Sequence, residues 1–329
     1  MKYRRLGRTG LEVSEISLGT WQVGGRWGDV FSDETADNIL NTAIDRGVNF
    51  IDTADVYGNR IGQSEEAVGR VVRSRSEKIY MATKCGRLIN PHVNEGYTPE
   101  ALTKYVEDSL SRMQLETIDL IQLHCPPTEV YYRPEIFETF ERLKEQGKIQ
   151  HLGVSVEKVE EALKAITYPN VDSVQIIFNI FRQRPAELFF EQAIKHDIGV
   201  IVRVPLASGL LTGKFNKDST FGDGDHRHFN RDGAAFDKGE TFSGVPYDIG
   251  LAAVDQLKSK FTDVDLVHLA LRFILSHQAV STIIPGASRV EQVISNLSLS
   301  DELQLDLEDM NALGDLYESL IKPHVHHLW

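Results

Sequence analysis

The sequence has few of the features that mark secreted, membrane-spanning or nucleic-acid-binding proteins. Its two cysteines, Cys85 and Cys125, are too few for a disulfide framework, and we expect buried structural thiols in a reducing compartment. No apolar run approaches the roughly 18 residues of a membrane span, and no signal-peptide pattern opens the chain. A net charge of −13 argues against a non-specific nucleic-acid surface. We therefore expect a cytoplasmic protein without membrane or nucleic-acid partners.

Common cofactor and metal motifs are also missing. No Gly-x-Gly-x-x-Gly follows the first predicted strand, and residues 209–214 (GLLTGK) do not have the spacing of a P-loop. No dense group of histidines and acidic residues marks a zinc site at a strand end, so no metal site is predicted. The missing glycine motif disfavours an open doubly wound sheet, which is the alternative fold.

What the chain does contain is a regular alternation of short apolar runs and amphipathic segments over 329 residues. Such alternation predicts parallel strands joined by helices, and eight units predict an α/β fold, a (β/α)8 TIM barrel. A single domain over residues 1–329 is expected, with an N-terminal β-hairpin in residues 3–15 and a long Gly-rich loop, 215–247, after the seventh strand. The predicted strands are residues 16–19, 50–52, 79–84, 118–124, 149–155, 173–176, 199–204 and 280–284.

Polar residues stand at the ends of three successive predicted strands. Asp52 ends the second strand and Tyr57 follows it, while Lys84 and His124 end the third and fourth. In a barrel these ends lie about 5 Å apart at one mouth. An ammonium group near a phenol lowers its pKa, an aspartate would hold that ammonium, and a histidine can hydrogen-bond a substrate oxygen. The set suits proton donation to a carbonyl oxygen that gains negative charge.

At these residues the sequence resembles the aldo-keto reductase family, over nearly its whole length. The resemblance implies a single barrel that reduces aldehydes and ketones to alcohols with NADPH. In it Tyr57 is the general acid, Lys84 lowers its pKa, Asp52 pairs with Lys84, and His124 orients the carbonyl group. The last two matching segments look most like the bacterial branch similar to potassium-channel β subunits. The matching segments are residues 52–58 (DTADVYG), 83–84, 123–124, 153–155, 175, 205–214 (PLASGLLTGK) and 284–288 (IPGAS).

The same resemblance places NADPH across the barrel mouth. It assigns residues to the nicotinamide end (Gly19, Thr20, Trp21), the carboxamide (Ser155, Gln175), the pyrophosphate (Pro205, Leu206, Ser208, Lys214) and the adenosine end (Ser288, Gln292, Asn296). Gly286 opens the turn before a helix whose amides and dipole favour an anion. Arg227, Arg231 and Arg289 are candidates for a 2′-phosphate, because arginine suits that group. The long loop is expected to fold over the cofactor.

Two positions depart from the family pattern. Val156 stands where an asparagine is usual, which removes one hydrogen bond to the carboxamide. Arg203 stands where an aromatic ring usually stacks on the nicotinamide. Either Arg203 pairs with an acidic residue, or its planar guanidinium stacks on the ring and disfavours the cationic NADP+.

Other features leave alternatives open. Trp27, Tyr57, His124 and residues 126–132 are expected to shape the substrate pocket, and residues 323–329 are expected to form a mobile tail, although Trp329 could instead cover the pocket. A cofactor-sensing regulatory subunit with slow turnover is the alternative function, and the complete set of four candidate catalytic residues favours the enzyme. A sugar-phosphate isomerase would need a further carboxylate base, for which the sequence offers no candidate.

Overall fold

The computed structural model describes residues 1–25, 28–299 and 305–329. Strands β1 (Tyr3–Arg5) and β2 (Glu12–Ser14) form an antiparallel hairpin, as predicted. The main sheet is parallel, and every strand pairs with the next in sequence. It consists of β3 (Leu18–Gly19), β4 (Phe50–Asp52), β5 (Tyr80–Cys85), β6 (Ile118–His124), β7 (Ile149–Ser155), β8 (Val171–Ile177), β9 (Gly199–Arg203) and β10 (Val280–Ile283).

The first and last strands of this sheet meet. Parallel bridges join Ile16 to Ile283 and Gly19 to Gly286, and the backbone N–H of Ser17 donates to the carbonyl of Ile283 at 2.8 Å. The eight-stranded sheet therefore closes into the predicted (β/α)8 barrel. The long loop after β9 is also present, over residues 213–246, and contains the 3-10 helices Lys238–Glu240 and Phe242–Gly244.

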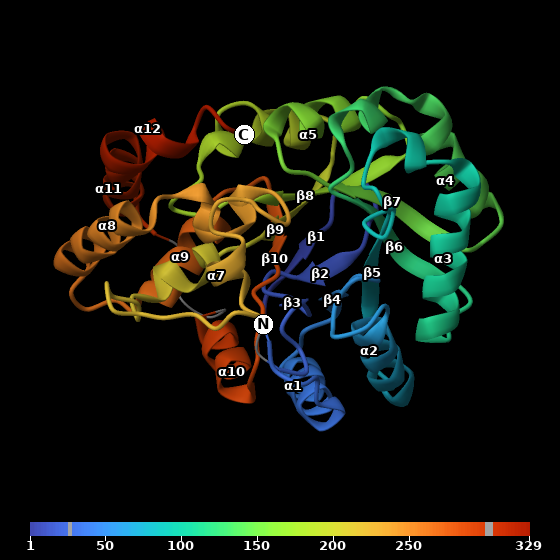
Figure 1. Cartoon of the computed structure of the whole chain (residues 1–329), viewed down its shortest axis with the longest axis horizontal. Helices are drawn as coiled ribbons and strands as arrows, with labels where there is room; N and C mark the ends of the chain where they lie inside the picture. The colour runs from blue at the N-terminus through green and yellow to red at the C-terminus, as the bar shows by residue number, and fades with distance from the viewer. Residues whose placement is uncertain (26–27, 300–304) are drawn as a thin grey trace.

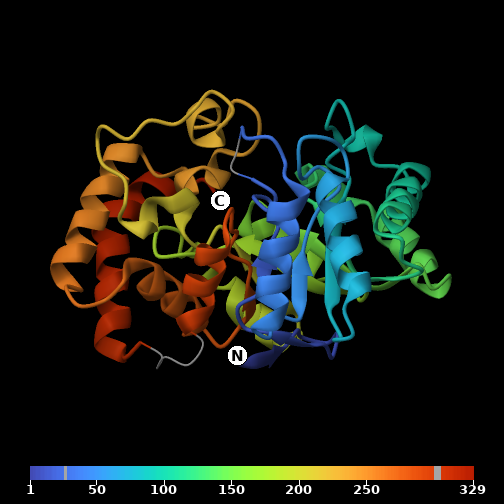
Figure 2. The same ribbon diagram turned by 90° about the horizontal axis from the view of Figure 1, so that it is seen from below.

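Helices surround the barrel, and α1 and α2 lie side by side on its outer wall (Figures 1 and 2). Their starts follow local sequence signals. The Ser32 hydroxyl accepts a hydrogen bond from the N–H of Thr35, and the Thr98 hydroxyl one from Ala101, so each caps a helix. The helices are α1 (Asp33–Asp45), α2 (Gln63–Ser74), α3 (Pro99–Met113), α4 (Pro134–Glu145), α5 (Val159–Ala165), α6 (Phe189–Lys195), α7 (His226–Phe229), α8 (Tyr247–Lys260), α9 (Leu266–Leu275), α10 (Val290–Ser298), α11 (Leu307–Leu316) and α12 (Lys322–Val325).

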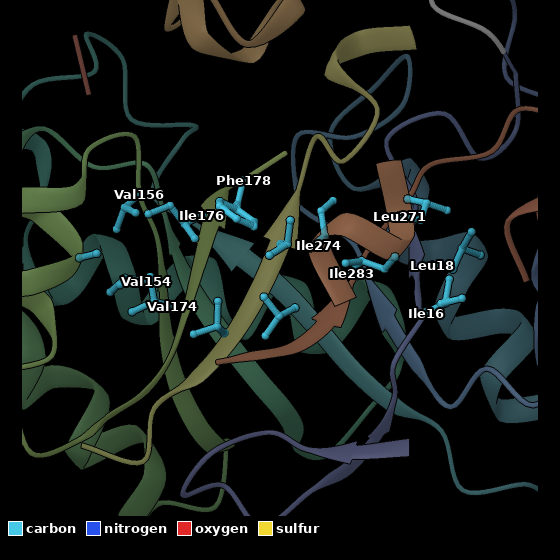
Figure 3. Packing of buried hydrophobic residues seen from close by; sticks show 14 of the residues in the cluster. Ile16, Leu18, Val154, Val156, Val174, Ile176, Phe178, Leu271, Ile274 and Ile283 are labelled. Carbon is cyan, nitrogen blue, oxygen red and sulfur yellow. The ribbon is translucent and has the colours of Figure 1, made fainter. Parts of the chain in front are cut away.

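Apolar packing holds the helices to the barrel, as Figure 3 shows for Val154, Val174 and Ile176 on neighbouring strands and for Ile274 of α9. A second apolar cluster contains residues of the strands, such as Phe50 and Leu120, together with residues of the N-terminal hairpin segment. These are Leu6, Leu11 and Val13, all buried. The hairpin thus packs against residues of the barrel wall and contributes to this second core.

The strand register gathers polar residues at the carboxyl ends of the strands. Asp52 is in register with Gly19, and His124, Ser155 and Gln175 are in register across three strands. Because carboxyl ends of parallel strands share one rim, these side chains surround one mouth.

The C-terminal region differs from the prediction. Within the described residues, α11 leads through a π-helical turn, Tyr317–Ile321, into α12. The expectation of a mobile tail is wrong, because Trp329 is only 5% exposed and its indole N–H donates to Asp237 at 2.9 Å. No helix in the described part of the chain is long and apolar enough to cross a membrane.

Candidate active site

Four residues predicted from the strand ends meet at the barrel mouth. The ammonium group of Lys84 forms a buried ion pair with Asp52 and donates to the Tyr57 hydroxyl at 3.2 Å and to the Thr53 carbonyl at 2.9 Å. The ring of His124 stands edge-on to that of Tyr57, with 5.9 Å between centroids. The phenol, its cationic neighbour and an imidazole therefore share one small space.

Asp52 is fixed by more than the lysine. Its second carboxylate oxygen accepts hydrogen bonds from the side-chain amides of Gln122, at 2.9 Å, and Gln175, at 2.8 Å. Asp52 is 1% exposed and Lys84 0% exposed, so both charges are removed from water and depend on these partners. Gln122 was not among the predicted site residues, because a glutamine inside an apolar strand carries no signal of its role. Gln175 was predicted to hydrogen-bond the carboxamide of the cofactor. In this structure its side-chain amide donates a hydrogen bond to Asp52.

The charges around the mouth set the protonation states. Burial raises the pKa of Tyr57, and the nearby ammonium of Lys84 opposes that rise without cancelling it. Lys84 therefore acts in the predicted direction, but burial outweighs its effect, so the pKa of Tyr57 lies above the ordinary value. Burial lowers the pKa of Lys84, but attraction to Asp52 and Tyr57 raises it overall, so the lysine stays charged.

His124 has the opposite tendency. Burial lowers its pKa well below the ordinary value, and the cations Lys84, Arg87 and Arg203 lower it further. The imidazole is therefore neutral at pH 7, and its Nδ1 atom has no hydrogen-bond partner in the described part of the protein. A neutral imidazole can donate a hydrogen bond to a carbonyl oxygen, but it is a poor proton donor. His124 is therefore better suited to orienting a carbonyl oxygen, and the protonated phenol of Tyr57 to donating the proton.

A cavity of about 540 Å³ runs from this mouth to α10. Every predicted cofactor residue except Arg231 lines it, Arg289 included, together with Asp52, Tyr57 and His124, whereas Lys84 lies behind them. The predicted residues on the cavity are Gly19, Thr20, Trp21, Ser155, Gln175, Arg203, Pro205, Leu206, Ser208, Lys214, Arg227, Gly286, Ser288, Gln292 and Asn296. Sequence reasoning missed Gln22, Phe215, Glu240 and Glu291, which also line it and carry no distinctive pattern.

The backbone beneath the cavity is strained. Val204, Ala207 and Ser208 have φ angles of 53°, 47° and 54°, a left-handed conformation that side chains disfavour. The side-chain amide of Asn179 supports this turn, because it donates to the Val204 carbonyl at 2.9 Å and to the Ser243 hydroxyl at 2.8 Å. Strain of this kind concentrates at functional sites, where surrounding contacts hold it in place.

The far end of the cavity carries charges of both signs. Lys214, Arg227 and Arg289 line it, but so does Glu291, 3.9 Å from Arg289. Arg227 is bound to Asp225, with its Nε atom 2.9 Å from the carboxylate. Arg231 is not among the cavity-lining residues of the described chain and lies over the ring of Tyr247, at 5.0 Å.

The Ser288 amide is already engaged. It donates to the side-chain oxygen of Gln292 at 2.8 Å, and the Ser288 hydroxyl reaches the same oxygen at 3.2 Å. This contact orders the turn before α10, whose first residue is Val290. An anion at this helix start would therefore compete with Gln292 for the Ser288 amide.

Arg203 pairs with an acid. Its Nη2 atom donates to Glu157 at 2.9 Å and to the Val156 carbonyl at 3.1 Å, and Nη1 lies 3.7 Å from Glu240. The side-chain ligand atoms of Cys125, Glu157 and Glu240 lie within 4.8 Å of one another, a spacing that could hold a metal ion. The guanidinium of Arg203 already supplies the positive charge beside the two carboxylates. The guanidinium still lines the cavity, so its pairing leaves it beside any cofactor bound there.

Only part of the set that was predicted to shape the substrate pocket lines the cavity. Tyr57 and His124 line the cavity with Trp21, whose ring is 6.2 Å from that of Tyr57. Residues 126–132 are not among the cavity-lining residues described, and Tyr131 is buried in the core. Trp27 lies outside the described residues.

The sequence and the fold both match those of known proteins. The sequence model of the Aldo/keto reductase family matches residues 15–318. The chain is 31% identical to the aldo-keto reductase YhdN of Bacillus subtilis (strain 168), over 99% of this chain and 96% of that one. It is 29% identical to a probable voltage-gated potassium channel subunit beta of Arabidopsis thaliana, over 93% of each chain.

A third relative is the NADH-specific methylglyoxal reductase of Escherichia coli (strain K12), 28% identical over 95% of this chain and 96% of that one. Among solved structures, the aldo-keto reductase AKR11C1 from Bacillus halodurans is 28% identical and covers 96% of both chains. Its holo form superposes with a TM-score of 0.77 and its apo form with 0.73.

Proposed function

Because the chain belongs to the aldo/keto reductase family, we propose that it reduces small aldehydes or ketones to alcohols with NADPH, and that it works in the cytosol. The observation that carries the proposal is the contact of the Tyr57 hydroxyl with the buried ion pair of Lys84 and Asp52, at the mouth of a long cavity. When bound, the reduced nicotinamide supplies a hydride to the carbonyl carbon.

The cavity suits a dinucleotide. It has hydrogen-bonding side chains at the end near Ser155 and Gln175, and cationic residues at the other end, Lys214, Arg227 and Arg289. The strained turn at residues 204–208 brings backbone close to the space between these ends. Residues of this chain would therefore hold the cofactor across the barrel mouth.

Each catalytic group has a defined task. Tyr57 transfers its hydroxyl proton to the carbonyl oxygen, whose π electrons form the new O–H bond. The phenolate left on Tyr57 is stabilised by the ammonium of Lys84, 3.2 Å away, which Asp52 keeps charged and oriented. Neutral His124 donates a hydrogen bond that orients the carbonyl oxygen toward Tyr57.

The preference for NADPH is the finer part of the proposal. Lys214, Arg227 and Arg289 supply positive charge for a 2′-phosphate, whereas Glu291 would repel that phosphate and could accept a hydrogen bond from a 2′-hydroxyl. Even with Arg227 paired to Asp225, three cations face two acids at this end, and this balance favours NADPH. The name of the Escherichia coli relative makes NADH the necessary comparison.

The proposal is tested by titrating the purified protein with NADPH and with NADH and following fluorescence. A panel of aldehydes is then added, and the absorbance of the reduced cofactor is followed. Tighter binding of NADPH with turnover supports the proposal. Absence of binding by both cofactors would refute it, and tighter binding of NADH would overturn the preference alone.

The second candidate is a regulatory subunit that senses the nicotinamide cofactor with slow turnover. The likeness to a plant channel β subunit over 93% of each chain favours it. Tight cofactor binding without turnover on any aldehyde would support this candidate over the reductase. The complete set of Asp52, Tyr57, Lys84 and His124 favours the enzyme.

A further inference from the structure

Residues 237–244 of the long loop lie between the cavity and the C-terminal residue Trp329. On the inner side, the Ser208 hydroxyl donates to the Glu240 carbonyl at 3.0 Å and accepts from the Phe242 N–H at 3.1 Å. The Glu240 side chain lines the cavity. This short segment therefore forms part of the wall that any ligand in the cavity would touch.

The outer side of the same segment packs against the indole of Trp329. Its N–H donates to Asp237 at 2.9 Å, and two glycines face its ring. A Cβ atom on Gly244 would lie 2.2 Å from the ring, and one on Gly239 would lie 3.0 Å from it. The loop thus has glycine at the two positions where a side chain would push the indole away.

The guanidinium of Arg182 packs against the ring of Trp329. Its guanidinium carbon lies 4.2 Å from the centre of the ring, a cation–π contact, and its Nη2 atom donates to the Glu157 carbonyl. Arg182 is 3% exposed, so the stack of arginine and indole is shielded from water. Glu157 in turn pairs with Arg203 at 2.9 Å, which connects the outer stack to the cavity wall.

The Glu240 carboxylate is not held in place by its own ion pairs. It lies 3.7 Å from Arg203 and 3.9 Å from Arg87, which is beyond hydrogen-bond distance. Glu157 competes for the same arginine, and its carboxyl group lies within 4.8 Å of that of Glu240. Burial raises the pKa of Glu157 to about 7, and its carboxyl group hydrogen-bonds that of Glu240 when one of the two is protonated. When both are ionised they repel each other, and the position of Glu240 then depends on the backbone that carries it.

We propose that Trp329 is a positioning residue, which holds residues 237–244 over the cavity and Glu240 beside Arg203, and so slows release of the nicotinamide cofactor. The effect on cofactor release rests on the proposed function. The contact between Trp329 and residues 237–244 does not. Removing the indole would leave a space under the loop and free it to open. The catalytic residues would keep their contacts, because Trp329 touches none of them.

The first test needs no cofactor. Amide hydrogen exchange of residues 237–244 is compared in the wild type, Trp329→Ala, Trp329→Phe and the control Leu328→Ala, which alters a neighbouring residue that is 39% exposed. We expect exchange to quicken by about tenfold or more in Trp329→Ala. It should be partly restored in Trp329→Phe and unchanged in the control. The unfolding midpoint should fall in Trp329→Ala, so exchange of the barrel strands is followed as well and should quicken less than that of residues 237–244. Unchanged exchange in Trp329→Ala would overturn the proposal.

The second test measures NADPH release from the same four proteins by stopped-flow fluorescence. We expect the dissociation rate constant to rise by about tenfold in Trp329→Ala and to recover toward the wild-type value in Trp329→Phe. A rate that is unchanged while exchange quickens would refute the link to the cofactor. If the wild type binds neither NADPH nor NADH, the proposed function fails, and the exchange data still decide whether Trp329 holds the loop.

Discussion

The two ends of the cavity are built in different ways. At the catalytic end, Lys84 and Asp52 are at most 1% exposed, and each of these two charges has several fixed partners. At the adenosine end, the side chains of Arg289 and Glu291 are 49% and 78% exposed and lie 3.9 Å apart. The buried ion pair holds the side chains of the catalytic end in one arrangement, and removing either partner should lower the free energy of unfolding markedly. The exposed charges should change the affinity for the cofactor only slightly, because water and salt screen them.

The largest expected effect comes from breaking the buried ion pair at the catalytic end. Lys84→Met would leave Asp52 buried without its cation and Tyr57 without stabilisation of its phenolate. We expect a loss of about 3 kcal/mol in the free energy of unfolding and of about a hundredfold or more in kcat. Denaturant unfolding and steady-state kinetics measure both. The matched variant Lys148→Met alters a half-exposed lysine that pairs with Glu107, and it should change neither quantity appreciably.

A smaller effect is expected on the pH dependence of the free energy of unfolding, and it comes from Asp55 near the catalytic end. Asp55 is buried behind this site, and burial, with Glu65 adding to it, raises its pKa to about 7. Because the folded protein holds this proton more tightly than the unfolded chain, the associated stability is present below about pH 4. It is lost as the pH rises toward 7.

Asp55→Asn should therefore flatten the pH dependence of the free energy of unfolding between about pH 4 and pH 7. Urea unfolding at a series of pH values checks this expectation. The same slope in wild type and variant would mean that Asp55 is ionised in the folded protein throughout that range.

The smallest effects are expected at the adenosine end. Arg289→Ala should weaken NADPH binding by about fivefold and leave NADH nearly unchanged, because a half-exposed charge contributes little. Glu291→Gln should strengthen NADPH binding by a similar factor, since it removes repulsion from a 2′-phosphate. Fluorescence titrations at low and high salt measure both changes, which should shrink as salt rises. A hundredfold effect would mean that this end is as tightly built as the other.

Much of the fold and part of the site followed from the sequence alone. The strands at residues 50–52, 118–124 and 149–155 have the predicted bounds, because short apolar runs between turn residues are strong signals. The strand-end positions of Asp52, Lys84 and His124 were enough to predict that they meet. Their meeting needed only the barrel topology and no knowledge of side-chain contacts.

The remainder depended on tertiary contacts. Glu240 stands in a loop without periodicity, so its place beside Arg203 has no sequence signal. Trp329 looked like part of a loose tail, yet two glycines and Arg182 provide its binding surface, and these lie far from it in sequence. The net rise in the pKa of Tyr57 was missed because burial, which exceeds the effect of Lys84, cannot be read from a motif.

The central claim is that Tyr57 donates the proton from a site organised by Lys84. It is tested most directly by single-turnover reduction of an aldehyde in Tyr57→Phe with NADPH already bound. We expect cofactor affinity within about twofold of the wild type and hydride transfer slower by about a hundredfold or more. Hydride transfer at the wild-type rate in the fully loaded variant would contradict it.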